Sequence, residues 1–298
     1  MIDSYKEKSY PQINAVFLDL DGTLLSSELE VSAYNKRTLG MVRERGVHIF
    51  LASGRPTAAL AKLAGSLPIG PYILASNGGC VVNIDSDEIL FSQELDKDTV
   101  SNILQIAQTC GVSPNIYSPS HWFVEEVNEF TKIEIRRVGI QPAIVSYDSL
   151  NTTNTTIIKI LLIGDDNSLA KCRHELEMSR LAKISWFHTY PEYLEIMPID
   201  VSKGTARDRL LDYLHIPIRN VLAIGDGIND IPLLADAGVS VAVSNANEEL
   251  LKIADFITLS NDSDGVSYAL KAFILGDQAA FSKLIKTNKG SFLSTGRE

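Results

Sequence analysis

The sequence predicts an α/β protein with a doubly wound parallel sheet and a second, inserted α+β domain. Short apolar runs at 15–19 and 47–52 flank a segment of helical spacing at 32–45, and the same alternation returns between 203 and 259. Such alternation is typical of βαβ units and therefore of a parallel sheet. We expect the two ends of the chain to form halves of one sheet.

The middle of the chain has a different pattern. Between 84 and 190, β-like runs come in pairs and are separated by helical segments. An insertion of about a hundred residues is large enough to be a domain of its own. We therefore expect residues 1–83 and 191–298 to form the core, and residues 84–190 to form an inserted α+β cap.

The charge and composition narrow the possible partners. The chain has 45% hydrophobic and 21% charged residues, as soluble globular proteins do. Its net charge of −10 opposes binding to a nucleic-acid backbone, so no nucleic-acid partner is expected. A small phosphorylated ligand is compatible with that charge, because one lysine and a bound cation can make a pocket locally positive.

The sequence also predicts a cytoplasmic protein with no membrane partner. The first apolar run is cut short by Asp19, so it lacks the apolar region of a signal peptide. No segment approaches the ~18 apolar residues of a membrane span. The three cysteines form no CxxC motif, and any intramolecular pairing leaves one of them over.

The most informative pattern is an apolar strand that ends in two aspartates. Residues 15–18 are apolar, and Asp19, Asp21, Gly22 and Thr23 follow. Residues i and i+2 of a strand share a face, so both carboxylates are expected to point into one crevice at the strand's carboxyl end. Ligands of open α/β sheets bind at that end. Adjacent carboxylates repel each other unless a cation or a shared proton holds them, which favours a functional pair over a solvated turn.

Two further segments offer groups that could hold an anion. A buried apolar run ends in Ser53, Gly54 and Arg55, where a hydroxyl and the turn amides could hold a phosphate oxygen. Such turns are common, so this one gains meaning only beside the other motifs. Lys203 opens an amphipathic helix, at the end that normally disfavours a cation. A nearby anion would resolve that conflict; an exposed lysine on the first turn is the plainer alternative.

A second strand end carries acidic groups. The apolar run 221–224 is followed by Asp226, and Asn229 and Asp230 come at the start of the next helix. This arrangement suits Mg²⁺, which takes one or two carboxylates and keeps water and substrate phosphate as its other ligands. The segment 164–166 also follows an apolar run but lacks the Asn-Asp pair, and we interpret it as a turn of the inserted domain.

Together these segments resemble the four ordered motifs of haloacid dehalogenase (HAD) superfamily phosphatases. The segments are 19–23, 53–55, Lys203 and 225–230, and the large insertion lies between the second and the third. An insertion at this place resembles the C2 cap of the Cof-type, or IIB, branch. The resemblance implies a Rossmann-like core and a cap that sets substrate specificity.

The resemblance also implies a role for each motif residue. Asp19 would be the nucleophile and a Mg²⁺ ligand, and Asp21 would act first as general acid and then as base. The Asp21 carbonyl and Asp226 would complete the protein ligands of Mg²⁺, supported by Asp230. The substrate would be bound by Ser53, Gly54, Arg55, Asn77, Lys203 and Asn229. The implied activity is Mg²⁺-dependent hydrolysis of small phosphorylated metabolites, such as sugar phosphates, through an aspartyl phosphate.

Two other functions use similar residues and stay open at this point. Phosphomutases of the same superfamily form the same aspartyl phosphate, and the four motifs do not separate them from phosphatases. A non-catalytic phospho-acceptor or binding module also clusters aspartates at strand ends and keeps a lysine. Such a module needs no inserted cap and has no use for an acid–base group at Asp21.

Overall fold

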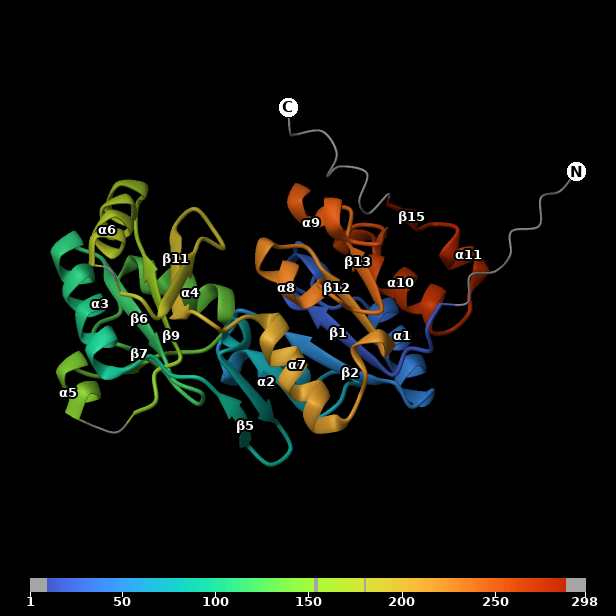
Figure 1. Ribbon diagram of the computed structural model, residues 1–298, viewed down its shortest axis with the longest axis horizontal. Coiled ribbons are helices and arrows are strands. Elements are labelled where there is room, and N and C mark those ends of the chain that lie inside the picture. Colours follow the sequence, from blue (N-terminus) through green and yellow to red (C-terminus); the bar gives the residue numbers. More distant parts are fainter. Residues whose placement is uncertain (1–9, 153–154, 180, 288–298) are drawn as a thin grey trace, which may run out of the picture. The chain divides into compact units, whose positions relative to one another are not determined.

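A computed structural model shows strands and helices alternating along the chain, which confirms the predicted α/β class (Figure 1). The structure describes residues 10–152, 155–179 and 181–287. These form two compact units: the described residues up to Ile49 together with those from Leu211 onward, and Phe50–Leu210. The chain crosses between the units within strand β2 (His48–Ala52) and within helix α7 (Lys203–Leu214). The predicted borders of the inserted domain, 84 and 190, lie inside the second unit and stay a prediction.

The first unit contains a mainly parallel sheet with the order β15-β14-β13-β12-β1. Strands β1 and β12 pair in parallel, from Ala15 opposite Val221 to Leu18 opposite Ile224. Every residue of both strands is buried, including Asp19 at the end of β1, and their apolar runs are typical of parallel strands covered on both faces. The strands are β1 (Ala15–Asp19), β12 (Val221–Gly225), β13 (Val239–Ala242), β14 (Phe256–Ile257) and β15 (Ile285–Lys286).

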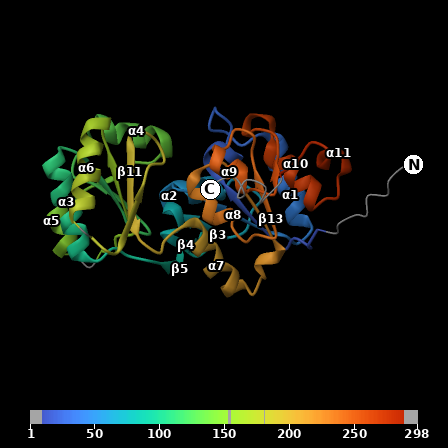
Figure 2. The same cartoon turned by 45° about the horizontal axis from the view of Figure 1, so that its top comes forward.

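Helices α1, α10 and α11 lie side by side in this unit (Figures 1 and 2). Ser32 caps the start of α1 by accepting a hydrogen bond from Asn35 N at 2.9 Å. The side-chain Oδ1 of Asn35 in turn accepts from Ser267 N of α10 at 3.1 Å, which ties the two helices together. The helices of this unit are α1 (Ala33–Glu44), α8 (Ile231–Leu234), α9 (Glu248–Ile253), α10 (Gly265–Phe273) and α11 (Gln278–Phe281).

The second unit begins with strands β2 to β5, which are neighbours in the strand order, and continues with a separate six-stranded sheet. Strand β2 pairs in parallel with β3, and β3, β4 and β5 continue in antiparallel fashion. Helix α2 packs against β3. These elements are β3 (Tyr72–Ala75), β4 (Cys80–Asn83), β5 (Glu88–Ser92) and α2 (Thr57–Ala64).

The larger sheet of the second unit has six strands in the order β10-β11-β9-β6-β7-β8. All of its pairings are antiparallel except that of β7 with β8. Its strands are β6 (Ser113–Tyr117), β7 (Trp122–Val124), β8 (Ala143–Ile144), β9 (Lys159–Ile163), β10 (Ile184–Phe187) and β11 (Tyr193–Pro198).

Four helices accompany this sheet. Helices α3 and α6 lie beside each other and enclose an apolar core that includes Ile103, Ile160, Leu169 and Leu194 (Figure 1). The helices are α3 (Lys97–Cys110), α4 (Glu129–Val138), α5 (Tyr147–Thr152) and α6 (Asp166–Ser179). In the described part of the chain, no helix combines the length and the apolar composition needed to cross a bilayer.

Candidate active site

Three aspartates meet at the carboxyl ends of β1 and β12. Asp19 is the last residue of β1, Asp226 directly follows β12, and Asp230 ends the short helical turn Ile228–Asp230. One carboxylate oxygen from each lies within 4.8 Å of the others. The parallel pairing of β1 with β12 explains this meeting, because strands in register end at the same edge of the sheet.

The surrounding hydrogen bonds orient Asp226. Thr23 donates its hydroxyl to Oδ1 of Asp226 at 2.9 Å. The fully buried Asp230 accepts from the backbone N–H groups of Asp226 at 3.1 Å and Gly227 at 2.9 Å through its Oδ2. The Asp226 carbonyl oxygen accepts from Asn247 N at 2.8 Å. Asp226 is therefore held at its side chain by Thr23, and at its backbone by Asp230 and Asn247.

Asp21 lies just beyond the end of strand β1. Strand β1 ends at Asp19, and Asp21 belongs to the turn Leu20–Leu24, in which Gly22 takes the left-handed φ of +81°. Glycine adopts that conformation without steric cost, so the chain turns here instead of continuing the strand. Asp21 is half-buried and is not one of the three clustered carboxylates. Strand alternation therefore does not place the Asp21 carboxylate, and its position beside Asp19 stays a prediction.

The donor set of this cluster fits a hard divalent cation. Carboxylate oxygens are the ligands that Mg²⁺ and Ca²⁺ take in proteins, and three of them converge here. Asp230 already accepts two backbone hydrogen bonds through one oxygen, whereas Asp226 and Asp19 stand at the strand ends. This difference suits a supporting role for Asp230.

The second unit holds the turn Ser53–Arg55 and the turn around Asn77, and backbone hydrogen bonds tie them together. Ser53 O accepts from Asn77 N at 2.9 Å, and Arg55 O accepts from Ser76 N at 3.0 Å. The Ser53 hydroxyl oxygen accepts from Arg55 N at 3.2 Å. A Cβ at Gly54 would lie 3.2 Å from the side-chain amide of Asn77, so the two turns are packed closely.

Asn77 has a special backbone conformation. Its φ is +55° and that of Ser76 is +50°, and asparagine tolerates this left-handed region better than most residues. The Asn77 side-chain amide donates to Oε2 of Glu195 at 2.8 Å. Both Asn77 and Ser53 are almost fully buried. The predicted substrate residues of this unit therefore belong to a packed and hydrogen-bonded region.

Lys203 is the first residue of α7 and is only 1% exposed. The plainer alternative from the sequence, an exposed lysine on the first turn, is therefore wrong. A buried ammonium group requires compensating partners, since its hydration is lost. Of the remaining predicted site residues, Asn229 is half-buried in the turn that leads to Asp230, within the first unit.

Sequence reasoning missed two charged residues of the second unit, Lys159 and Glu195. Lys159 lies 3.1 Å from Glu195, and its Nζ donates to Gly54 O at 2.8 Å. Each stands as a single charged residue within a strand that is otherwise apolar and buried. That isolation was the available signal, because charged residues are rarely fully buried unless paired.

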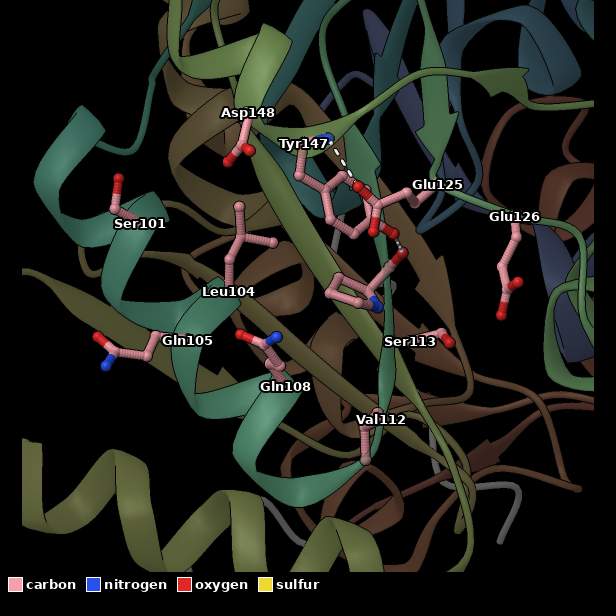
Figure 3. A pocket seen from close by; sticks show the side chains of 11 residues that line it. Ser101, Leu104, Gln105, Gln108, Val112, Ser113, Glu125, Glu126, Tyr147 and Asp148 are labelled. Atoms are coloured by element: carbon pink, nitrogen blue, oxygen red, sulfur yellow. Dashed lines mark hydrogen bonds between the residues drawn. The ribbon is translucent and has the colours of Figure 1, made fainter.

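A separate pocket of about 660 Å³ in the second unit contains none of the motif residues (Figure 3). It is lined by α3, by the start of β6 and by the segment around Tyr147, whose backbone N–H donates to Glu125. Its charged lining residues are Glu125, Glu126 and Asp148. None of its lining residues is a lysine, arginine or histidine, so this pocket offers no cationic side chain to a phosphate group.

Comparison with known proteins identifies the family. A family model described as haloacid dehalogenase-like hydrolase matches residues 16–270. The chain belongs to the haloacid dehalogenase-like hydrolase family. The predicted family and fold are thus confirmed, and so is the predicted enzyme class, a hydrolase.

Individual relatives agree with this assignment. The 5-amino-6-(5-phospho-D-ribitylamino)uracil phosphatase YcsE of Bacillus subtilis is 26% identical over 265 residues, which cover 88% of this chain and 96% of the relative. A solved haloacid dehalogenase-like hydrolase from Bacteroides thetaiotaomicron is 33% identical with a TM-score of 0.81, covering 88% of this chain and 99% of that one. The fold is also similar to that of BT4131, a HAD subclass IIB sugar phosphatase, with 23% identity, a TM-score of 0.75, and coverage of 87% and 98%.

Proposed function

We propose that the protein is a Mg²⁺-dependent phosphatase that hydrolyses small phosphorylated metabolites, such as sugar phosphates, through an aspartyl-phosphate intermediate. The observation that carries this proposal is the convergence of Asp19, Asp226 and Asp230 within 4.8 Å at the ends of two parallel strands. The family of hydrolases to which the chain belongs and the phosphatases among its relatives support it. YcsE is named for a small phosphorylated substrate, which favours a metabolite over a macromolecule.

The metal would be held by the carboxylates of Asp19 and Asp226 and by the carbonyl oxygen of Asp21, with Asp230 in support. A bound Mg²⁺ would supply positive charge that stabilises the phosphoryl group during transfer. Asp230 would keep the loop after β12 in place through its two hydrogen bonds to backbone N–H groups. Thr23 would keep Asp226 in one rotamer through its bond to Oδ1.

The reaction would proceed in two steps. A carboxylate oxygen of Asp19 attacks phosphorus, the bond from phosphorus to the leaving oxygen breaks, and Asp21 gives that oxygen a proton. Asp21 then takes a proton from water as the water attacks the aspartyl phosphate, which releases inorganic phosphate and restores Asp19. Two easier displacements thereby replace one difficult one.

The phosphate would be held by groups of the second and third motifs. Lys203 would contribute a positive charge, and Ser53 a hydroxyl donor. The remaining residues proposed to bind substrate are Gly54, Arg55, Asn77 and Asn229.

Residues 84–190 are proposed to act as a C2-type cap that selects among metabolites. We also propose a cytoplasmic location, because Cys80, Cys110 and Cys172 are free thiols.

The test is a screen of phosphorylated sugars, nucleotides and pyridoxal phosphate with Mg²⁺ and with EDTA. The proposal expects inorganic phosphate to be released from at least one substrate class, and only with Mg²⁺. A phosphomutase would instead form an isomer of the substrate without releasing phosphate. A phospho-acceptor module would become phosphorylated and show no turnover. Either result would replace the proposed function.

A further inference from the structure

Lys159 is a buried lysine with an unusual set of partners. It begins β9 and is 2% exposed, although an ammonium group that loses its hydration needs close compensating groups. Its Nζ donates to the carbonyl oxygen of Gly54 at 2.8 Å and lies 3.1 Å from Oε2 of Glu195. The ring of Tyr117 lies 4.6 Å from the same nitrogen and adds a favourable cation–π contact.

Glu195 connects this lysine to the second substrate loop. It lies in β11, is 4% exposed, and accepts hydrogen bonds through both of its carboxylate oxygens. Oε2 accepts from the side-chain amide of Asn77 at 2.8 Å, and Oε1 accepts from the hydroxyl of Thr189 at 2.7 Å. The pair therefore contacts two loops at once, at the Gly54 carbonyl and at the Asn77 amide.

The contact with Gly54 also affects Ser53. In a trans peptide the C=O and the following N–H point in opposite directions, so a donor on Gly54 O directs the N–H of Arg55 the other way. That N–H donates to the Ser53 hydroxyl oxygen at 3.2 Å. A hydroxyl that accepts from Arg55 can turn its own proton toward another acceptor. The lysine charge also polarises the intervening peptide and strengthens its N–H as a donor.

We infer that Lys159 and Glu195 are positioning residues for the phosphate-binding end of the site. Lys159 orients the Ser53 hydroxyl through the peptide between Gly54 and Arg55, and Glu195 fixes the side chain of Asn77. This inference rests on the proposed function, in which Ser53 and Asn77 hold the substrate. The pair would therefore affect binding of the phosphate group, which every substrate shares. It would not affect binding of the leaving group, which differs from one metabolite to the next.

The test removes both charges together, because removing one would leave the other buried and unpaired. In the Lys159→Met, Glu195→Gln double variant, we expect kcat/KM to fall about 10- to 100-fold, as misplacement of a positioned group does. The factor should be the same for p-nitrophenyl phosphate and for a sugar phosphate, and the inhibition constant of inorganic phosphate should rise alongside. Lys159→Arg, which keeps a cationic donor, should retain most of the activity.

The control is Tyr117→Phe, which removes a hydroxyl that bonds to Glu134 in the same buried region but keeps the ring beside Lys159. It should keep wild-type kcat/KM. Circular dichroism and the thermal midpoint report folding of each variant. If the double variant does not fold, Glu195→Gln alone is measured by the same criteria. It keeps the shape of the side chain but removes the charge that faces Lys159 and weakens the acceptor for Asn77, while Lys159 keeps its hydrogen bond to Gly54 O.

Two results would overturn the inference. One is a folded variant with unchanged kcat/KM and unchanged phosphate inhibition. The other is a loss that differs between the two substrates, which would place the pair at the leaving group. A wild-type protein that releases no phosphate from any substrate refutes the proposed function instead. Calorimetric binding of inorganic phosphate to the wild type and the double variant then tests the inference by itself.

Discussion

Gly22 faces the carboxylate of Asp226 so closely that no side chain fits between them. A Cβ at position 22 would lie 2.4 Å from Oδ2 of Asp226, well inside van der Waals contact. The neighbouring Thr23 donates its hydroxyl to the other oxygen of the same carboxylate. The turn after β1 therefore fixes the orientation of Asp226 from two sides.

This contact predicts the effect of Gly22→Ala. The added methyl group must displace Asp226, so we expect kcat/KM to fall by about 100-fold. The left-handed φ of +81° strains an alanine backbone, which lowers the free energy of unfolding by about 1 kcal/mol or more. Steady-state kinetics with p-nitrophenyl phosphate and chemical unfolding measure the two effects separately.

Gly46→Ala is the matched control for that variant. Gly46 also has a left-handed φ, +75°, but a Cβ there would meet no atom within 4 Å. It should lose stability by about 1 kcal/mol and keep wild-type kcat/KM per folded molecule. If the two alanine variants lost activity equally, the contact between Gly22 and Asp226 would have no functional role.

The acidic cluster predicts that Mg²⁺ stabilises the folded protein as well as supporting turnover. A ligand that binds only the folded state adds about 2.7 kcal/mol at a concentration of 100 times its dissociation constant. The thermal midpoint should therefore rise with Mg²⁺ and return to its lower value with EDTA. Asp226→Asn should abolish this shift.

Glu44→Gln serves as the control for Asp226→Asn. Glu44 is exposed at the end of α1, and its substitution removes one negative charge away from the cluster. It should keep the full Mg²⁺ shift. A midpoint that responds to Mg²⁺ equally in both variants would show that the cation binds outside the cluster.

The proposed mechanism predicts different defects at the two aspartates of the first motif. Asp19→Asn is isosteric but removes the nucleophile, so turnover should fall by about 10³-fold or more while the fold is kept. Asp21→Asn should slow both steps, and the aspartyl phosphate should accumulate. Mass spectrometry of the quenched enzyme should then find one phosphoryl group on the peptide that contains Asp19. Near wild-type turnover by the Asp19→Asn variant would exclude the nucleophile assignment.

Cys80 predicts a dependence of stability on alkaline pH. Burial raises the pKa of its thiol from the usual 9.0 to about 11, against smaller opposing effects of the Thr57 hydrogen bond and of Lys159. The folded state therefore keeps the thiol proton better than the unfolded state does. The resulting stabilisation is complete below pH 9 and is lost as pH rises through about 11.

Unfolding of the wild type and of Cys80→Ala at several pH values measures this effect. The difference between their free energies of unfolding should shrink between pH 9 and pH 11.

Below pH 9, iodoacetamide should label the half-buried Cys110 well before Cys80, since only the thiolate reacts and Cys80 is 1% exposed. Equal labelling of both cysteines in the folded protein would contradict the burial and the raised pKa of Cys80.

The sequence predicted the ends of β1 and β12 well, because strand ends depend on local alternation of apolar and polar residues. Asp19 and Asp226 lie at those ends, and parallel pairing brings them together. The placement of Asp21 beside Asp19 stays a prediction, because strand β1 ends at Asp19 and its alternation does not extend to Asp21. Lys159 and Glu195 were missed for a different reason. Their partners Gly54 and Asn77 lie 105 and 118 residues away, and no local pattern encodes such a contact.

The pairing of β1 with β12 also determines when the acidic cluster can form during synthesis. Thr23 and Asp226 are 203 residues apart in the chain. At roughly 5 to 20 residues per second, a ribosome needs about 10 to 40 s to make the intervening segment. Through that interval, the edge of the apolar strand β1 that pairs with β12 has no partner, while the whole of Phe50–Leu210 can emerge. An unpaired apolar strand edge invites association with other chains, so the nascent protein should depend on chaperones until β12 is made.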